Sequence, residues 1–65
     1  MGTYKVTIEK FLNGTSYGTN EYFVDDCFVN SEQEAKIKAF EQAQFEDEDE
    51  FNEWKIISVE YFEDK

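Results

Sequence analysis

The segment Ser31-Glu32-Gln33-Glu34 constrains the fold of this chain more than any other, because it fixes where a helix begins. In such a capping box the serine hydroxyl accepts a hydrogen bond from the amide of Glu34, and the Glu34 carboxylate reaches back to the amide of Ser31. Small residues then recur at intervals of four, at Ala35, Ala39 and Ala43. Such a stripe lets a helix lie close to a sheet, so we predict a helix over residues 32–46. Ile37 falls off the stripe and is a candidate exposed apolar residue.

The segments on either side of this helix have the pattern of β-strands. Residues 3–12 alternate between apolar and polar side chains, which predicts a half-buried strand. Residues 19–29 and 54–62 are rich in aromatic and β-branched types and predict two further strands. Asn13-Gly14 is a turn signal, and we expect the loop to continue to Gly18, so that the first two strands form a hairpin. Asp25-Asp26 is expected to break or bulge the end of the second strand.

These elements predict one α+β domain with the order ββαβ over residues 1–65. A helix between the second and third strands returns the chain, so those two strands run parallel. The first strand then fits between them and is antiparallel to each, which gives a three-stranded sheet of order 2-1-3. We expect a right-handed crossover and a helix on one face only.

The sheet face without a helix is a candidate apolar interface. Strict alternation places four apolar side chains there, namely Phe11, Phe23, Trp54 and Ile56. Together with Ile37 they are either scattered surface residues, which are common, or the contact surface of a homodimer or another partner. Both alternatives stay open at the level of the sequence.

The charge of the chain is strongly acidic and unevenly distributed. Sixteen acidic residues stand against six Lys, there is no Arg or His, and the net charge is −10. Residues 39–65 alone carry ten acids and two Lys. Such a surface repels nucleic acid and anionic membranes and attracts basic proteins. We therefore expect a basic protein as partner, with no direct binding of nucleic acid and no membrane contact.

The residues needed for catalysis or for a cofactor are poorly represented. Without His or Arg, the usual general base and phosphate clamp are missing. Cys27 is the single cysteine, so it forms no internal disulfide, and acids precede it. Asp47 and Asp49 resemble the start of a calcium loop, but the later ligand positions do not fit. We expect no enzyme, no metal site and no cofactor, and a soluble cytoplasmic protein because no apolar leader or membrane span is present.

The run Glu46-Asp47-Glu48-Asp49-Glu50 is the most unusual feature of the sequence. Adjacent like charges gain nothing for folding, and five of them usually mark a solvated segment or an interaction surface. Phe45 and Phe51 flank the run and tie it to the fold, so a fixed array of negative charge is the alternative to a solvated helix end. We expect Asp47, Asp49 and Glu50 to be solvated. The candidate partner-binding acids are Glu41, Glu46, Asp47, Glu48, Asp49, Glu50, Glu53, Glu60, Glu63 and Asp64.

Two resemblances extend this interpretation. The segments Tyr4-Lys5-Val6-Thr7-Ile8-Glu9, Ser31-Glu32-Gln33-Glu34-Ala35 and Val59-Glu60-Tyr61 resemble the small DpnD/PcfM-like proteins of phages and plasmids. That resemblance implies a ββαβ fold and an origin in a mobile element, and it implies no activity. In size, acidity and lack of Arg the chain is similar to phage-encoded DNA mimics that inhibit host proteins.

The sequence therefore favours a binding protein. Our leading hypothesis is a small acidic phage-type protein that inhibits a basic nucleic-acid-binding protein of the bacterial host by presenting a DNA-like negative surface. The alternative is an accessory module, without DNA mimicry, that associates through the apolar sheet face.

Overall fold

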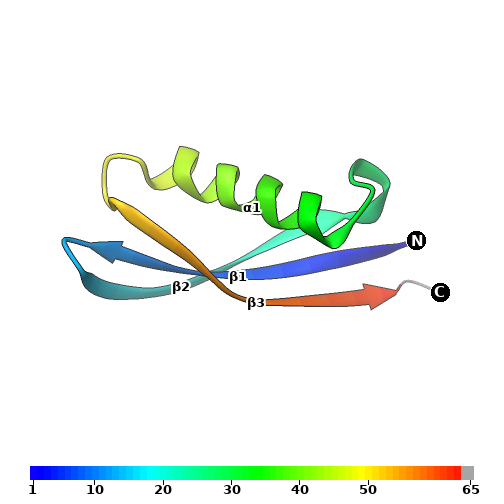
Figure 1. The fold of residues 1–65 in the computed structure, drawn as a ribbon, viewed down its shortest axis with the longest axis horizontal. Coiled ribbons are helices and arrows are strands. Elements are labelled where there is room, and N and C mark those ends of the chain that lie inside the picture. Colours follow the sequence, from blue (N-terminus) through cyan, green and yellow to red (C-terminus); the bar gives the residue numbers. More distant parts are fainter. Residues whose placement is uncertain (64–65) are drawn as a thin grey trace.

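The chain folds into a hairpin, a helix and a returning strand, as the computed structural model shows for residues 1–63 (Figure 1). The elements are β1 (Gly2–Leu12), β2 (Thr15–Asp25), a 3-10 helix η1 (Asp26–Phe28), α1 (Glu32–Asp47) and β3 (Glu53–Glu63). The sheet order is β2-β1-β3, and both outer strands are antiparallel to β1. The predicted α+β fold is thus confirmed, including the order of the strands and the single helix on one face of the sheet.

The hairpin is tighter than predicted. Asn13 and Gly14 have φ values of 52° and 84°, and a two-residue turn of this kind requires positive φ at both positions. The second strand therefore starts at Thr15 and not at residue 19. Gly18, expected in the loop, lies within β2 with φ 107°, where the register against β1 shifts. Glycine tolerates that conformation, so the chain forms a bulge there instead of a longer loop.

The two ends of the helix differ in how well the sequence predicts them. Ser31 is the N-cap, and its hydroxyl accepts a hydrogen bond from the Glu34 amide at 3.3 Å, as expected. The Glu34 carboxylate accepts from the amide of Asn30 at 3.4 Å, one residue before the predicted donor. The helix continues one residue beyond the predicted end, to Asp47.

The segment between the second strand and the helix also differs from the prediction. The second strand ends at Asp25 and not at residue 29, because the chain turns into η1 at the Asp pair.

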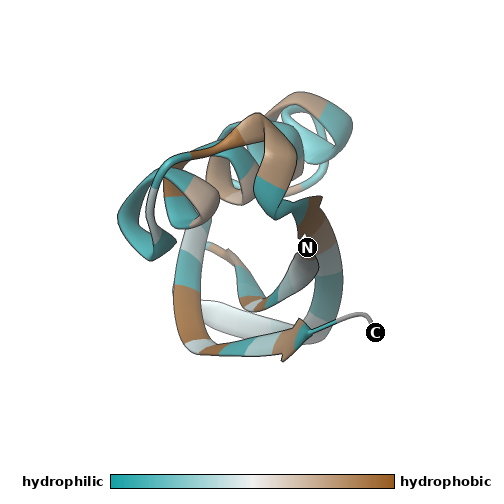
Figure 2. Ribbon diagram, turned by 90° about the vertical axis from the view of Figure 1, so that its right-hand side faces the viewer, coloured by the Kyte–Doolittle hydropathy of each residue, from teal (hydrophilic) through white to brown (hydrophobic). Residues whose placement is uncertain are grey.

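The core lies between α1 and one face of the sheet. Figure 2 shows the molecule from the end where the termini lie, with the sheet curving beneath the helix. The alanine stripe is fully buried, as are Val6 and Ile8 of the central strand. Small side chains on α1 let the helix approach the sheet closely. The remaining buried apolar side chains are those of Tyr22, Val24 and Val29.

A bulge in β3 changes which side chains face the helix. Thr7 pairs with Ser58, whereas the next residue, Ile8, pairs with Ile56, so Ile57 is an extra residue in β3. An extra residue reverses the alternation of the side chains that precede it. Trp54 and Ile56, predicted on the open face, therefore pack against the core beneath the helix. That part of the prediction is wrong, because alternation was assumed to be unbroken along the strand.

Candidate partner-binding surface

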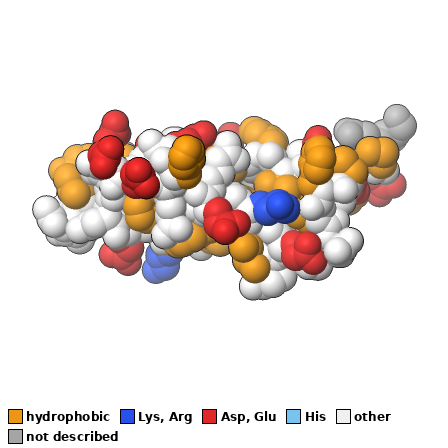
Figure 3. Space-filling view, turned by 90° about the horizontal axis from the view of Figure 1, so that it is seen from above, with side chains coloured by type: hydrophobic (Ala, Val, Ile, Leu, Met, Phe, Trp, Pro, Cys, Tyr) orange, Lys and Arg blue, Asp and Glu red, His pale blue; other side chains and the backbone are white. Residues whose placement is uncertain are grey.

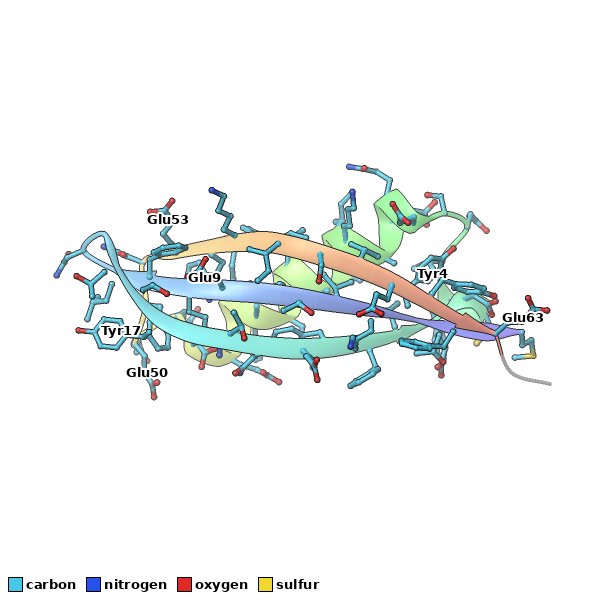
Figure 4. All side chains as sticks on the ribbon, turned by 90° about the horizontal axis from the view of Figure 1, so that it is seen from below. Tyr4, Glu9, Tyr17, Glu50, Glu53 and Glu63 are labelled. Atoms are coloured by element: carbon cyan, nitrogen blue, oxygen red, sulfur yellow. The ribbon has the colours of Figure 1, made fainter. Side chains whose placement is uncertain are left out.

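The acidic run forms the connection between α1 and β3. Glu46 and Asp47 are the last helical residues, and Glu48, Asp49 and Glu50 form the turn that follows. Figure 4 shows Glu50 and Glu53 at the end of the molecule where the β1–β2 hairpin turns. All carboxylates here except that of Asp47 belong to exposed residues. We call this surface the acidic end, and it comprises Glu46, Glu48, Asp49, Glu50 and Glu53.

Asp47 differs from its neighbours because its side chain points into the fold. Its carboxylate forms an ion pair with Lys10, and the two side chains are only 16% and 8% exposed. The expectation that Asp47 is solvated is therefore wrong. The sequence contains a signal for this pair. Asp47 continues the four-residue stripe of Ala43, and Lys10 continues the alternation of Val6 and Ile8.

The buried position of Lys10 is compatible with its charge. Burial lowers the pKa of the Lys10 ammonium. The hydrogen bond to Asp47 and the neighbouring Tyr22 raise it, and together they outweigh burial, so the pKa of Lys10 lies above its ordinary value. The ammonium also lies 5.5 Å from the centre of the Phe51 ring, which adds a cation–π contact. Lys10 therefore holds together the helix end, the central strand and the segment that leads into β3.

Backbone hydrogen bonds fix the rest of the acidic turn. The amides of Glu50-Phe51 both donate to the carbonyl of Asp47 at 3.0 Å. The amide of Asn52 donates to the carbonyl of Phe11 at 3.0 Å. The side chains of Asn52 and Asn13 share a hydrogen bond of 3.3 Å, and the Asn13 amide donates to the Asn52 side chain at 3.1 Å. The acidic turn is thus tied to the helix, to β1 and to the hairpin turn.

Aromatic side chains lie beside these carboxylates. Phe45 is 73% exposed and Tyr17 is 61% exposed. The rings of Tyr17 and Phe51 pack at 5.9 Å between centroids, and Figure 4 shows Tyr17 and Glu50 at the same end of the molecule. Sequence reasoning found Phe45 and Phe51 but missed Tyr17, because it placed that residue in a loop and not in β2. Aromatic residues are enriched in protein–protein interfaces.

The other predicted acids do not join the acidic end. Glu41 is exposed on the helix. Glu60 forms an ion pair of 3.1 Å with Lys5, and that contact, followed by the one with Glu21, raises the pKa of Lys5. Glu63 lies at the opposite end of the sheet (Figure 4), and Asp64 falls outside the described residues. The nine predicted acids within residues 1–63 therefore form one cluster and several separate charges along the molecule.

The face of the sheet away from α1, which we call the open face, is less apolar than predicted. Phe23 is 62% exposed on this face, Phe11 is half-buried, and Trp54 and Ile56 are absent from it. Phe62, which was not among the candidates, is 48% exposed and lies 5.7 Å from the Lys5 ammonium. Ile37 is 50% exposed on the helix, as expected.

A second carboxylate network closes the end of the sheet where the termini lie. The carboxylate of Asp26 accepts hydrogen bonds from the Tyr61 hydroxyl at 2.7 Å and from the Gly2 amide at 2.8 Å. The hydrogen bond from Tyr61, together with that from Gly2, lowers the pKa of Asp26 below its ordinary value. The same bond raises the pKa of Tyr61 to about 12. This network attaches β3 and the start of β1 to η1.

The described residues contain no group of three or more side chains placed to hold a metal ion. Among the helices of residues 1–63, none is long and apolar enough to cross a membrane. No family model, no curated protein and no solved structure matches this chain. The resemblance to DpnD/PcfM-like proteins stays a prediction.

Proposed function

We propose that this protein binds a basic, nucleic-acid-binding protein through its acidic end and thereby competes with nucleic acid for that site. The observation that carries the proposal is the way the acidic run is held. Asp47 binds Lys10 inside the fold, and the backbone of the turn is bonded to three elements. The neighbouring carboxylates are thus presented on an ordered turn. Charges held in this way bind a partner without the entropy cost of ordering a flexible segment.

The shape of the molecule supports competition with nucleic acid. The described chain measures 41 × 16 × 15 Å between its outermost Cα atoms. A DNA strand advances ~3.4 Å per phosphate along the axis, so this length corresponds to about twelve phosphate steps. Figure 3 shows acidic side chains along the whole length of the helix-bearing side, with few basic ones between them. A basic groove shaped for a duplex would meet negative charge over most of its length.

The aromatic residues at the acidic end fit an arginine-rich partner in particular. A guanidinium group pairs with carboxylates and also stacks on aromatic faces. Tyr17 offers an exposed ring at the same end of the molecule as Glu50 (Figure 4), and the exposed Phe45 directly precedes Glu46 in the chain. Nucleic-acid-binding sites are rich in Arg and Lys, so the same groups that contact phosphates and bases would bind here.

The test removes charge from the acidic end and leaves the Lys10–Asp47 pair intact. The triple variant Glu48→Gln, Asp49→Asn, Glu50→Gln keeps the shape of the turn. The control variant Glu21→Gln, Asp25→Asn, Glu63→Gln loses the same charge outside the acidic end. Both are immobilised beside the unchanged protein, a bacterial lysate is applied, and bound proteins are eluted with a salt gradient.

We expect the unchanged chain and the control to capture a basic protein that elutes only at high salt. The same protein should elute from the triple variant at lower salt. Duplex DNA should release the captured protein from the immobilised chain. In the reverse experiment, this chain should displace labelled DNA from the captured protein, which lowers the fluorescence anisotropy of the DNA. If the triple variant retains full affinity and an unchanged salt dependence, or if DNA and this protein bind the target together, the proposal fails.

A second candidate function rests on the open face. Phe23 and Phe62 are exposed there on either side of Lys5, and within residues 1–63 no element covers this face. An accessory module that associates through this surface would lose its partner when Phe23 is changed to Lys. It would keep that partner in the triple variant of the acidic end.

A further inference from the structure

The helix covers the two outer strands unequally. On β2, the helix-facing side chains of Tyr22 and Val24 are 5% and 8% exposed. On β3, Trp54, Ile56 and Val59 are only partly buried against the core, and Tyr61 is 45% exposed. The helix therefore shields the β2 side of the sheet, and the apolar face of β3 remains half open.

A groove lies beside the half-open strand β3. It lies between α1 and β3, has a volume of about 200 Å³, and is lined by Gln33, Lys36, Ile37, Phe40, Glu41 and Ile56. Ile37 is half exposed at its rim. The isoleucine that falls off the alanine stripe is thus placed beside the half-open strand.

The outer edge of β3 is unpaired in the described chain. The strand is eleven residues long and bonds only to β1. Its outward amides and carbonyls are free to pair with another strand, and the chain has no Pro that would prevent this. The edge of β2 carries a bulge and charged residues, as β3 does, but its helix-facing side chains Tyr22 and Val24 are already buried. A strand added at that edge would therefore cover little further apolar surface.

We propose that a second copy of this chain pairs with the outer edge of β3, antiparallel and about a two-fold axis. The two sheets then join into one sheet of six strands, with both helices on the same face. The inference does not rest on the proposed function, because it concerns a different surface.

The bulge at Ile57 determines which register is allowed. Residues that lie directly opposite each other in an antiparallel pair must point to the same face. Because of the bulge, Trp54 and Ile56 before it share the helix-facing side with Val59 and Tyr61 after it. A symmetric register that opposes Ile56 to Val59 of the second copy therefore also opposes Trp54 to Tyr61. All four half-covered side chains gain an apolar neighbour in this register.

The same register is favourable in charge. It opposes Lys55 to Glu60 of the second copy, and the two-fold axis produces this pair twice. Lys55 forms no ion pair within residues 1–63, although the chain is strongly acidic. Glu60 pairs with Lys5 through one of its oxygens, Oε1, and the other is available. This complementarity selects a second copy of the chain as the occupant, because the edge supplies both members of the pair.

The test uses exchanged charges and sedimentation equilibrium over a range of protein concentrations. Lys55→Glu places two glutamates opposite each other, and Glu60→Lys places two lysines opposite each other, so each variant should dimerise about tenfold or more weakly. A mixture of the two variants restores both pairs and should form a heterodimer as stable as the unchanged dimer. Salt should strengthen the unchanged dimer by screening its net charge, whereas binding of a basic partner weakens with salt.

Two further variants keep the test decisive if Glu60→Lys disturbs the contact with Lys5. Ile37→Glu alters an exposed helix position at the rim of the groove and should weaken the dimer. Phe23→Lys alters the open face and should leave it unchanged. A monomer at millimolar concentration in high salt would overturn the proposal. So would a dimer that withstands Lys55→Glu, or one that is lost on Phe23→Lys.

Discussion

At each end of the sheet, an aspartate side chain points toward the fold and binds residues of other elements. The two aspartate contacts differ in their exposure to solvent. At the acidic end, Asp47 pairs with Lys10, and both side chains are largely buried. At the terminal end, Asp26 accepts bonds from Tyr61 and Gly2, with the Tyr61 side of the network exposed. A buried charge that loses its partner is costly, whereas an exposed one is rehydrated. The acidic end is therefore held by a strong but fragile contact, and the terminal end by a weaker and more tolerant one.

The largest effect is expected when the buried pair is broken from one side. Lys10→Met keeps the volume of the side chain but leaves the Asp47 carboxylate buried without a cation. Removal of one partner costs about 3–5 kcal/mol, and we expect about 3 kcal/mol because Asp47 retains some exposure. A 65-residue domain has a total stability of only about 3–10 kcal/mol, so urea unfolding should show a much lower midpoint.

The matched control replaces both charges. The double variant Lys10→Met with Asp47→Leu removes the pair and leaves no buried charge, so it should recover most of the lost stability. If Lys10→Met alone changes the free energy of unfolding by less than about 1 kcal/mol, the pair is not the contact that holds the acidic end.

The contacts at the acidic end also show which features of the fold can be predicted from the sequence. The capping box at Ser31 and the alanine stripe predict the helix to within one residue at its end, because both signals are local. The order of the strands follows from the chain connectivity. The inward turn of Asp47 is not local, since nothing within five adjacent acids distinguishes one from another. It becomes predictable only when the stripe on the helix and the alternation that leads to Lys10 are considered together.

The bulge in β3 is even harder to predict from the sequence than the inward turn of Asp47. Ile56 and Ile57 are both isoleucines, so either could face the core, and the sequence does not reveal which one is the extra residue. The choice depends on the pairing with Thr7 and Ile8 of a distant strand. That one position decides the face of Trp54 and therefore which apolar side chains are available to a partner.

A smaller effect is expected at the terminal end when Gly2 acquires a side chain. A Cβ atom at this position would collide with the Tyr61 hydroxyl and with the backbone carbonyl of Phe62. The tyrosine can move, but the carbonyl belongs to the paired strand β3. Gly2→Ala should therefore cost about 1–3 kcal/mol, as overpacking usually does. Thermal unfolding measures this loss, and Gly14→Ala serves as a control with open space but positive φ.

Two readouts separate the outcomes at Gly2. The variant should lose the hydrogen bond between Tyr61 and Asp26 as well as stability, whereas the Gly14 control should lose stability through backbone strain alone. An unchanged unfolding temperature for Gly2→Ala would show that the end of β3 is free to move away.

The smallest effect is expected from pH, because the Tyr61–Asp26 contact is exposed to solvent. Its hydrogen bond to Asp26 raises the pKa of Tyr61 to about 12, above the ordinary value of 10.0. A group whose pKa is raised by folding contributes stability that is complete below the ordinary value and is lost as the pH rises through the folded value. The pKa of Asp26 is lowered, so its contribution is present above the ordinary value of 3.8 and is lost as the pH falls below it. The contact should therefore stabilise the fold across the neutral range and fail at both extremes.

Comparison with Tyr61→Phe isolates this contribution, since both proteins carry the same net charge and the same repulsion until Tyr61 ionises. The difference in unfolding free energy between them should be constant from neutral pH to about 10 and should disappear near 12. The ring resonances of Tyr61, followed by NMR in the folded protein, should titrate with a midpoint of about 12. If Tyr61 titrates near its ordinary value of 10.0, or if the stability difference does not change between pH 10 and 12, the hydroxyl does not hold the terminal end as described.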